Sequence, residues 1–235
     1  MAVTIRSSPY PFPHGGLQAD RTALVLIDMQ RDFLDADGYL AAMGYDLAGV
    51  RAAVPQAARL LAASRRAGLT VIHTRQGYRP DLADLPPHRA ALVASGQLAV
   101  GKPGPLGRFL VRGEPGFAIV DAVAPAAGEP IIDKTANSAF SGTDLAAILH
   151  ARGIRSLIVA GITTDVCVHS TLRDATDRGY ECLLATDACG SGDPEAHRGA
   201  LHMMQVEAGI HGATADTAAI VAALAAMAQP ESGEL

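Results

Sequence analysis

The sequence predicts an α/β fold, a doubly wound parallel sheet with helices on both faces. Two observations support this prediction. Short runs along the chain are almost continuously apolar, as strands buried on both faces are, and helical patterns separate these runs. With 235 residues, of which 49% are hydrophobic and 18% charged, the chain is long enough for one large core. We therefore expect a single domain over residues 1–235, in which the proline-rich residues 1–20 form an extended N-terminal arm.

The first half of the chain contains two predicted strands and one helix. Residues 23–27 form an apolar strand, an alanine-rich helix follows over residues 50–67, and residues 70–74 form the second strand. Gly68 is typical of the residue that follows the end of a helix. The next stretch, residues 75–116, is rich in proline and glycine and too long for an ordinary connection. We expect it to cover or line a site.

The second half alternates strands and helices more regularly. Strands are predicted at residues 130–134, 157–160 and 181–186, and helices at residues 143–152, 168–178, 194–208 and 216–227. Alternation of this kind indicates a parallel sheet covered on both faces. In such sheets ligands bind outside the carboxyl ends of the strands.

Three predicted strands end near side chains that can take part in catalysis. Asp28 follows the first strand, Lys134 ends the third, and Cys167 stands where the strand at 157–160 gives way to a helix. Taken singly, Asp28 is typical of a turn or helix cap, and Lys134 of a surface lysine. Lysine is scarce, however, with only Lys102 and Lys134 among 19 basic residues. Because parallel strands end at a common edge, we expect the three side chains to meet there.

These three residue types suit acyl transfer from an amide. The first-turn N–H groups and the helix dipole favour a thiolate at Cys167, which attacks a carbonyl carbon. The Asp28 carboxylate takes and returns the thiol proton, and the Lys134 ammonium orients that carboxylate. The backbone N–H groups of Thr163 and Cys167 are candidates for an oxyanion hole. Cys182, by contrast, lies inside a predicted strand and is expected to be a small core residue.

Composition argues against several classes of partner. The net charge of -5 and the scattered arginines give no reason to bind nucleic acid or an anionic membrane. The three cysteines include no Cys-x-x-Cys pair and form no disulfide framework, which favours a reducing cytoplasm. Residues 1–16 lack an apolar signal core, and no run reaches the roughly 18 apolar residues of a membrane span. We expect a cytoplasmic protein whose partner is a small molecule.

Several segments carry a resemblance to a known family. They are residues 23–33, 73–75, 79–86, 112–116, 132–134, 161–167 and 173–184. Over about residues 9–224 the chain resembles the isochorismatase-like cysteine hydrolase superfamily, and within it is most similar to the biuret hydrolases.

The resemblance implies a catalytic triad of Asp28, Lys134 and Cys167, and an oxyanion hole from the backbone of Thr163 and Cys167. It also implies a non-proline cis peptide between Ile162 and Thr163, and a homotetramer of Rossmann-like α/β subunits with no metal and no cofactor. The activity it implies is hydrolysis of a C–N bond in a small linear urea derivative. Ammonia would be released through a covalent thioester intermediate.

Two positions depart from the biuret hydrolase pattern. That pattern has a second lysine shortly after the catalytic one, whereas residues 135–140 contain no cation. Glu207 stands where the pattern has a pocket glutamine, and a carboxylate accepts from a terminal NH₂ group but cannot donate to a carbonyl. Biuret is therefore one of several expected substrates, beside ureidoacrylate, N-carbamoyl compounds and simple amides.

We expect the pocket to lie beneath a loop that carries Arg75 and Arg79. Its expected substrate-binding residues are Phe33, Arg75, Asn137 and Glu207. Because most of these are polar and only 4% of the chain is aromatic, small, flat amides rich in hydrogen-bonding groups suit the pocket.

Other functions remain open as alternatives. Members that cleave isochorismate lack a cysteine at the nucleophile position, so Cys167 argues against that reaction. Nicotinamidases bind a metal through an Asp-x-His set after the second strand, which residues 73–77 do not offer. A nicotinamidase-like amidase and a non-catalytic small-molecule binding module are the remaining candidates.

Overall fold

A computed structural model describes residues 2–228, and its centre is a six-stranded parallel sheet in the order β5-β2-β1-β6-β7-β8. The strands are β1 (Thr22–Ile27), β2 (Thr70–Gln76), β5 (Ile131–Lys134), β6 (Ser156–Ile162), β7 (Glu181–Gly190) and β8 (Ala213–Ala215). Neighbouring strands pair in parallel throughout this sheet. The predicted doubly wound α/β class is confirmed. Met1 and residues 229–235 of the predicted domain lie outside the described residues.

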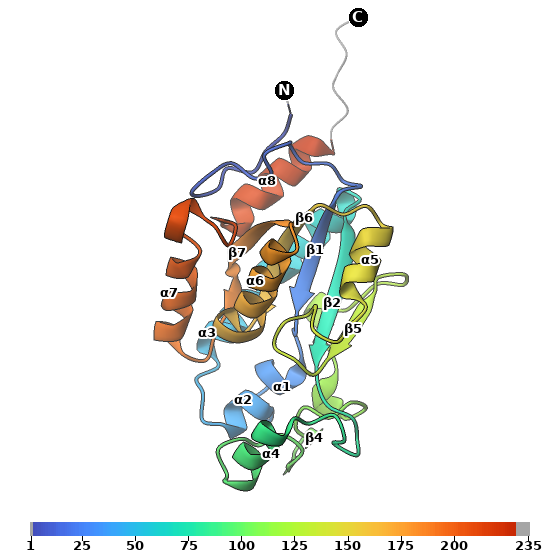
Figure 1. Cartoon of the computed structure of the whole chain (residues 1–235), viewed down its shortest axis with the longest axis vertical. Helices are drawn as coiled ribbons and strands as arrows, with labels where there is room; N and C mark the ends of the chain where they lie inside the picture. The colour runs from blue at the N-terminus through green and yellow to red at the C-terminus, as the bar shows by residue number, and fades with distance from the viewer. Residues whose placement is uncertain (1, 229–235) are drawn as a thin grey trace, which may run out of the picture.

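Helices cover both faces of the sheet (Figure 1). On one face, α3 (Ala48–Arg66) packs against α8 (Thr217–Met227). On the other lie α5 (Leu145–Ala151), α6 (His169–Asp177) and α7 (Pro194–Met203). Every residue of β1 and β6 is buried, which explains why these two strands are such continuous apolar runs.

Short elements gather beyond the carboxyl ends of the strands, at the lower end of the molecule in Figure 1. They are α1 (Arg31–Leu34), α2 (Tyr39–Ala42), α4 (Pro87–Ala94), β3 (Pro103–Gly104), β4 (Gly107–Arg108) and the 3₁₀ turn η1 (Pro115–Phe117). A second 3₁₀ turn, η2 (Asp121–Val123), packs against α3. The sequence predicted only a loop over residues 75–116. No residue of α4 is fully buried, and its eight residues are fewer than the 11 or so over which helical periodicity can be recognised.

The long segment after β2 is fixed to the rest of this end by buried polar contacts. The Asp32 carboxylate accepts a hydrogen bond of 2.8 Å from the backbone N–H of Leu110. The Gln30 side chain donates to the carbonyls of Gln76 and Phe117, at 3.1 Å each. These contacts hold the segment over the strand ends.

The N-terminal arm differs from the extended arm that the sequence predicted. Ile5 pairs with Phe12 in an antiparallel bridge, and Ser8 pairs with Thr214 of β8. Ile5 and Phe12 are both fully buried, so the arm folds back on itself to cover apolar surface. No helix within residues 2–228 is long and apolar enough to cross a membrane.

Candidate active site

The nucleophile candidate Cys167 lies in η3 (Thr164–Val168), a turn of π-helix that joins β6 to α6. The sequence predicted a helix starting at 168, and α6 begins one residue later. The carbonyl of Thr163 accepts hydrogen bonds from the N–H groups of Val166 and Val168, which sets the shape of this turn. The Cys167 side chain is buried at the edge of the sheet, with a residue exposure of 7%.

A close approach of two strands brings this turn next to the end of β1. Gly161 has a φ of 129°, and a Cβ on it would lie 2.1 Å from the carbonyl oxygen of Ile27. Only glycine fits both the conformation and the space. Beyond Ile27, Asp28 adopts a left-handed conformation with a φ of 50°. Strain of this kind in a non-glycine residue is typical of functional sites.

The structure brings Asp28, Lys134 and Cys167 together, as the sequence predicted. The Lys134 ammonium lies 2.7 Å from the Asp28 carboxylate and 3.3 Å from the Cys167 sulfur. Both charged side chains have a relative exposure of 0%. Lys134 belongs to β5, two strands away from β1, so its long side chain crosses the end of β2 to reach Asp28.

The buried ammonium and carboxylate have further hydrogen-bonding partners. Lys134 Nζ donates to Gln76 Oε1 at 2.7 Å and to the carbonyl of Ala136 at 3.1 Å. The Thr74 hydroxyl donates to Asp28 Oδ1 at 2.6 Å. These contacts leave the three side chains little freedom to reorient, as catalysis by positioned groups requires.

Burial acts in opposite directions on the two proton donors of this cluster. Burial raises the pKa of the Cys167 thiol to about 12, with Lys134 lowering it and Asp28 raising it further. Burial lowers the pKa of Lys134, but Asp28 and Cys167 outweigh that effect, so its net shift is upward. The surroundings therefore favour a neutral thiol at rest, in contrast to the resting thiolate that the sequence predicted.

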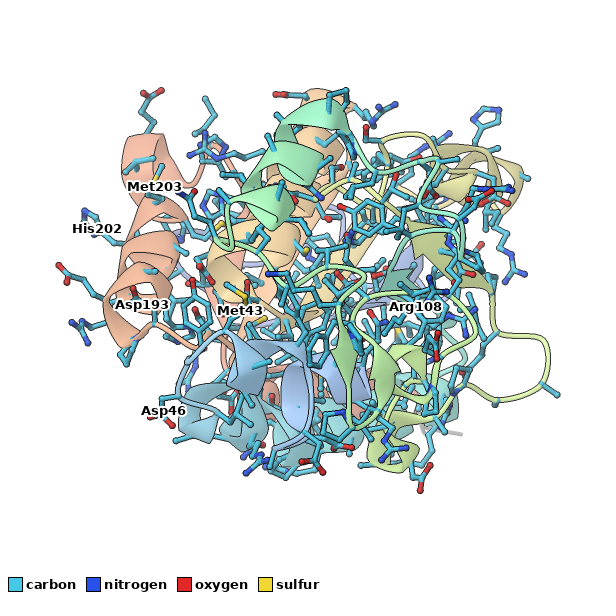
Figure 2. All side chains as sticks on the ribbon, turned by 90° about the horizontal axis from the view of Figure 1, so that it is seen from below. Met43, Asp46, Arg108, Asp193, His202 and Met203 are labelled. Atoms are coloured by element: carbon cyan, nitrogen blue, oxygen red, sulfur yellow. The ribbon has the colours of Figure 1, made fainter. Side chains whose placement is uncertain are left out.

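A pocket of about 340 Å³ opens onto Cys167. Its walls come from α1, α2, α4, the long segment after β2, the loop after β5 and the start of α7. Figure 2 looks at this end of the molecule, with Asp193 at the start of α7 on one side and Arg108 of β4 on the other. The prediction that residues 75–116 line a site is confirmed, since Tyr78, Leu98 and Leu110 are among the lining residues.

Two of the four expected substrate-binding residues line this pocket and two do not. Phe33 and Asn137 lie in its wall. Arg75 does not: it forms a two-pronged ion pair with Asp133, at 2.7 and 3.0 Å, and stacks over Phe117. The expectation for Arg75 is therefore wrong. Alternate residues of a strand point to opposite faces, and Gln76, the next residue, occupies the site instead.

Glu207 is also outside the pocket, which corrects the second expectation. It is exposed, in the 3₁₀ turn η4 (Val206–Ala208) between α7 and β8. Helix α7 starts at the carboxyl edge of the sheet and runs back, so a residue that precedes the parallel strand β8 lies at the amino edge. The sequence predicted the helix to continue to residue 208, but α7 ends at Met203, and Glu207 lies beyond it with a left-handed φ of 48°.

Replacing Glu207 with glutamine is expected to leave kcat/KM and substrate preference unchanged within about twofold, as for surface substitutions generally. The measurement compares ureidoacrylate and biuret in the variant and the parent protein. Asn137→Ala serves as the positive control, because Asn137 lines the pocket and its loss should lower kcat/KM. A change of preference in Glu207→Gln would contradict this placement.

The pocket also differs in character from the one predicted. Although the chain has only five phenylalanines and five tyrosines, Phe33, Tyr39, Tyr45 and Tyr78 all line it. Aromatic faces are therefore available to stack on a planar substrate. The chain-wide aromatic fraction gave no sign of this concentration.

Sequence reasoning missed several polar residues of the site. Gln76 follows the same rule that identified Asp28, since β2 runs two residues longer than predicted and Gln76 ends it. Asp165 lines the pocket, and its buried Oδ1 has no hydrogen-bond partner within residues 2–228. Arg89 of α4 lines it as well. Its place depends on how the long segment folds, for which the sequence offers no periodic signal.

Backbone features of the nucleophile turn bear on the oxyanion hole. Thr163 and Cys167 both line the pocket, and the peptide bond between Ile162 and Thr163 is cis, as the resemblance implied. The oxyanion hole itself stays a prediction. In the described part of the chain, no three His, Cys, Asp or Glu side chains gather as a metal site would need. Cys182 is fully buried in β7, as expected for a core residue.

Comparisons with known proteins agree with this architecture. Among curated relatives, ureidoacrylate amidohydrolase RutB from Methylorubrum extorquens is 34% identical over 230 residues, covering 95% of this chain and 89% of the relative. A cysteine hydrolase from Pseudomonas syringae pv. phaseolicola has a TM-score of 0.74 at 27% identity, covering 90% of this chain and 95% of that one. N-carbamoylsarcosine amidase from Thermoplasma acidophilum has a TM-score of 0.62 at 26% identity, covering 84% and 96%.

The family model for the isochorismatase domain matches residues 22–218. This range begins with β1 and ends at the start of α8, and so includes every strand of the central sheet and the three clustered side chains. The chain therefore belongs to the isochorismatase family.

Proposed function

We propose that this protein is a cysteine-dependent amidohydrolase that cleaves a C–N bond in a small linear ureido compound. The observation that carries the proposal is the buried cluster of Cys167, Lys134 and Asp28 beside the pocket. A purely binding module would gain nothing from holding an ion pair against a thiol, because burying charges costs free energy.

The chemistry follows from the positions of these groups. Cys167 Sγ attacks the carbonyl carbon while Asp28 takes the thiol proton. The C–N bond then breaks, and Asp28 returns the proton to the leaving nitrogen, which departs as ammonia. Water, deprotonated by Asp28, attacks the S-acyl intermediate and releases the acid product and the free thiol. Lys134 orients Asp28 and offsets the negative charge that develops during both steps.

Two observations support a ureido substrate. Relatives of this chain include a ureidoacrylate amidohydrolase and an N-carbamoylsarcosine amidase, whose names both describe substrates with a carbamoyl group. Oδ1 of Asp165 has no hydrogen-bond partner among the described residues, so it can accept a terminal N–H, the role that the sequence assigned to Glu207. Ureidoacrylate is the substrate that we propose first, and biuret is its neutral competitor.

The test is an ammonia-release screen over ureidoacrylate, biuret, N-carbamoyl amino acids and nicotinamide. We expect turnover of the ureido and carbamoyl compounds, with kcat/KM for ureidoacrylate above that for biuret. Turnover of nicotinamide with none of the ureido compounds would reject the proposed substrate class. A higher kcat/KM for biuret than for ureidoacrylate would instead favour the biuret hydrolase activity that the sequence resemblance implied.

A further inference from the structure

We propose that Arg89 anchors a carboxylate of the substrate, so that the site selects ureido acids over neutral ureido compounds. The choice of reaction rests on the proposed function. The anion-binding role of Arg89 does not, because it follows from the contacts and charges of the pocket itself.

Arg89 is held in place by three acceptors at the pocket wall. Its Nη1 donates to the Tyr78 hydroxyl and to the carbonyl of Thr135, the latter at 3.0 Å, and its Nη2 donates to Asn137 Oδ1 at 2.7 Å. Thr135 directly follows Lys134. The guanidinium is therefore fixed to the loop that directly follows Lys134.

These contacts leave donors free. A guanidinium has five N–H groups, and Arg89 uses three of them. Its Nε and one hydrogen of Nη2 have no acceptor among residues 2–228, and none of the described acidic side chains forms a salt bridge with it. Free N–H groups on a planar guanidinium can donate to the oxygens of a carboxylate.

Other arginines on the same long segment differ in this respect. Arg79 pairs with Asp81 at 3.0 Å, Arg108 with Glu114 at 3.1 Å, and Arg112 with Asp84 at 3.7 Å. Arg89 is half-buried, and in the described chain it is the one permanently positive side chain that lines the pocket. Holding a half-buried cation without a carboxylate partner costs free energy, and an anionic substrate would offset this cost by pairing with it.

The charges of the pocket also give the substrate a direction. Asp165 and Asp193 line it as well, and Asp165 is two residues from the nucleophile. A ureido acid can place its N–H groups toward Asp165 and its carboxylate toward Arg89. The reverse orientation would set like charges against each other.

The first experiment measures how fast Cys167 is alkylated by iodoacetate, which is an anion, and by iodoacetamide, which is neutral. The readout is the rate with iodoacetate divided by the rate with iodoacetamide. Dividing one rate by the other cancels the intrinsic reactivity of the thiol. We expect Arg89→Gln to lower this ratio by at least about tenfold, the lower end of the range for a hydrogen bond to a charged group. Arg89→Lys should keep most of the ratio because it keeps the charge. Arg79→Gln, which removes an exposed charge outside the pocket, is the matched control and should leave it unchanged.

The second experiment compares kcat/KM for ureidoacrylate with kcat/KM for its methyl ester and for biuret, by ammonia release. The acid-over-neutral preference should fall by at least about tenfold in Arg89→Gln. An equal loss for acid and neutral substrates would show that Arg89 only supports the loop, and would overturn the proposal, as would an unchanged alkylation ratio. If the parent protein cleaves no ureido compound, the proposed function fails, and the alkylation ratio still decides whether Arg89 binds anions.

Discussion

Replacing Cys167 with alanine is expected to lower turnover of ureidoacrylate by at least about 10⁴-fold, the scale on which loss of a covalent nucleophile acts. The remaining groups can bind substrate, but no atom is left to form the S-acyl intermediate. Steady-state ammonia release measures the loss. Activity within tenfold of the parent, equivalent to about 1.4 kcal/mol of barrier, would end the covalent mechanism.

The other cysteines provide the control for this prediction. Cys182 is fully buried in β7 and is not among the residues that line the pocket, so Cys182→Ala should keep the parent's kcat even if it lowers stability by about 1 kcal/mol. Iodoacetamide should inactivate both the parent and Cys182→Ala, with the added mass on Cys167. Its pKa is raised by burial, so inactivation should be slow at neutral pH and accelerate as the pH rises.

Removing either charge of the buried pair is expected to cost at least about 10³-fold in kcat/KM, because the carboxylate carries the proton and the ammonium orients it. Asp28→Asn and Lys134→Met are the single variants, and their combination is the third. We expect kcat/KM of the double variant to lie within about threefold of that of the less active single variant, because the two groups act as one unit. Losses that multiply would show that Asp28 and Lys134 work independently.

Stability provides a second readout from the same three variants. The pair is 2.7 Å apart with both side chains fully buried. Lys134→Met leaves a buried carboxylate without its counter-charge, which should cost about 3–5 kcal/mol in urea unfolding. The double variant leaves neither charge and should recover a large part of this loss. A double variant less stable than both single ones would contradict the coupling that we infer from the geometry.

The central sheet could be predicted because its sequence signals are local. Strands β1 and β6 are buried along their whole length, so each is a continuous apolar run that no surface helix resembles. The ends of parallel strands then meet at one edge by topology alone. That is why Asp28, Lys134 and Cys167 could be grouped from their positions in the sequence, before any distance between them was known.

The walls of the pocket could not be predicted, because they depend on contacts between distant parts of the chain. Arg89 and Asn137 are 48 residues apart, and the fold brings them within 2.7 Å. Arg75, nearer to the strand end, was expected in the pocket, but the register of β2 against β5 pairs it with Asp133 instead. Strand register decides on which face of the sheet a side chain lies, and a shift of one residue moves the side chain to the opposite face.

Glu207 shows the same limit on a larger scale. Its alignment with a pocket glutamine of the biuret hydrolases suggested a pocket residue, but the direction of α7 carries it to the opposite edge of the sheet. The sequence by itself determined the parallel sheet and its three reactive side chains, because apolar strands and the polar residues at their ends are recognisable from short stretches of sequence. Only the tertiary structure decided which cation and which carboxylate face the substrate, because those positions are set by long-range packing of loops.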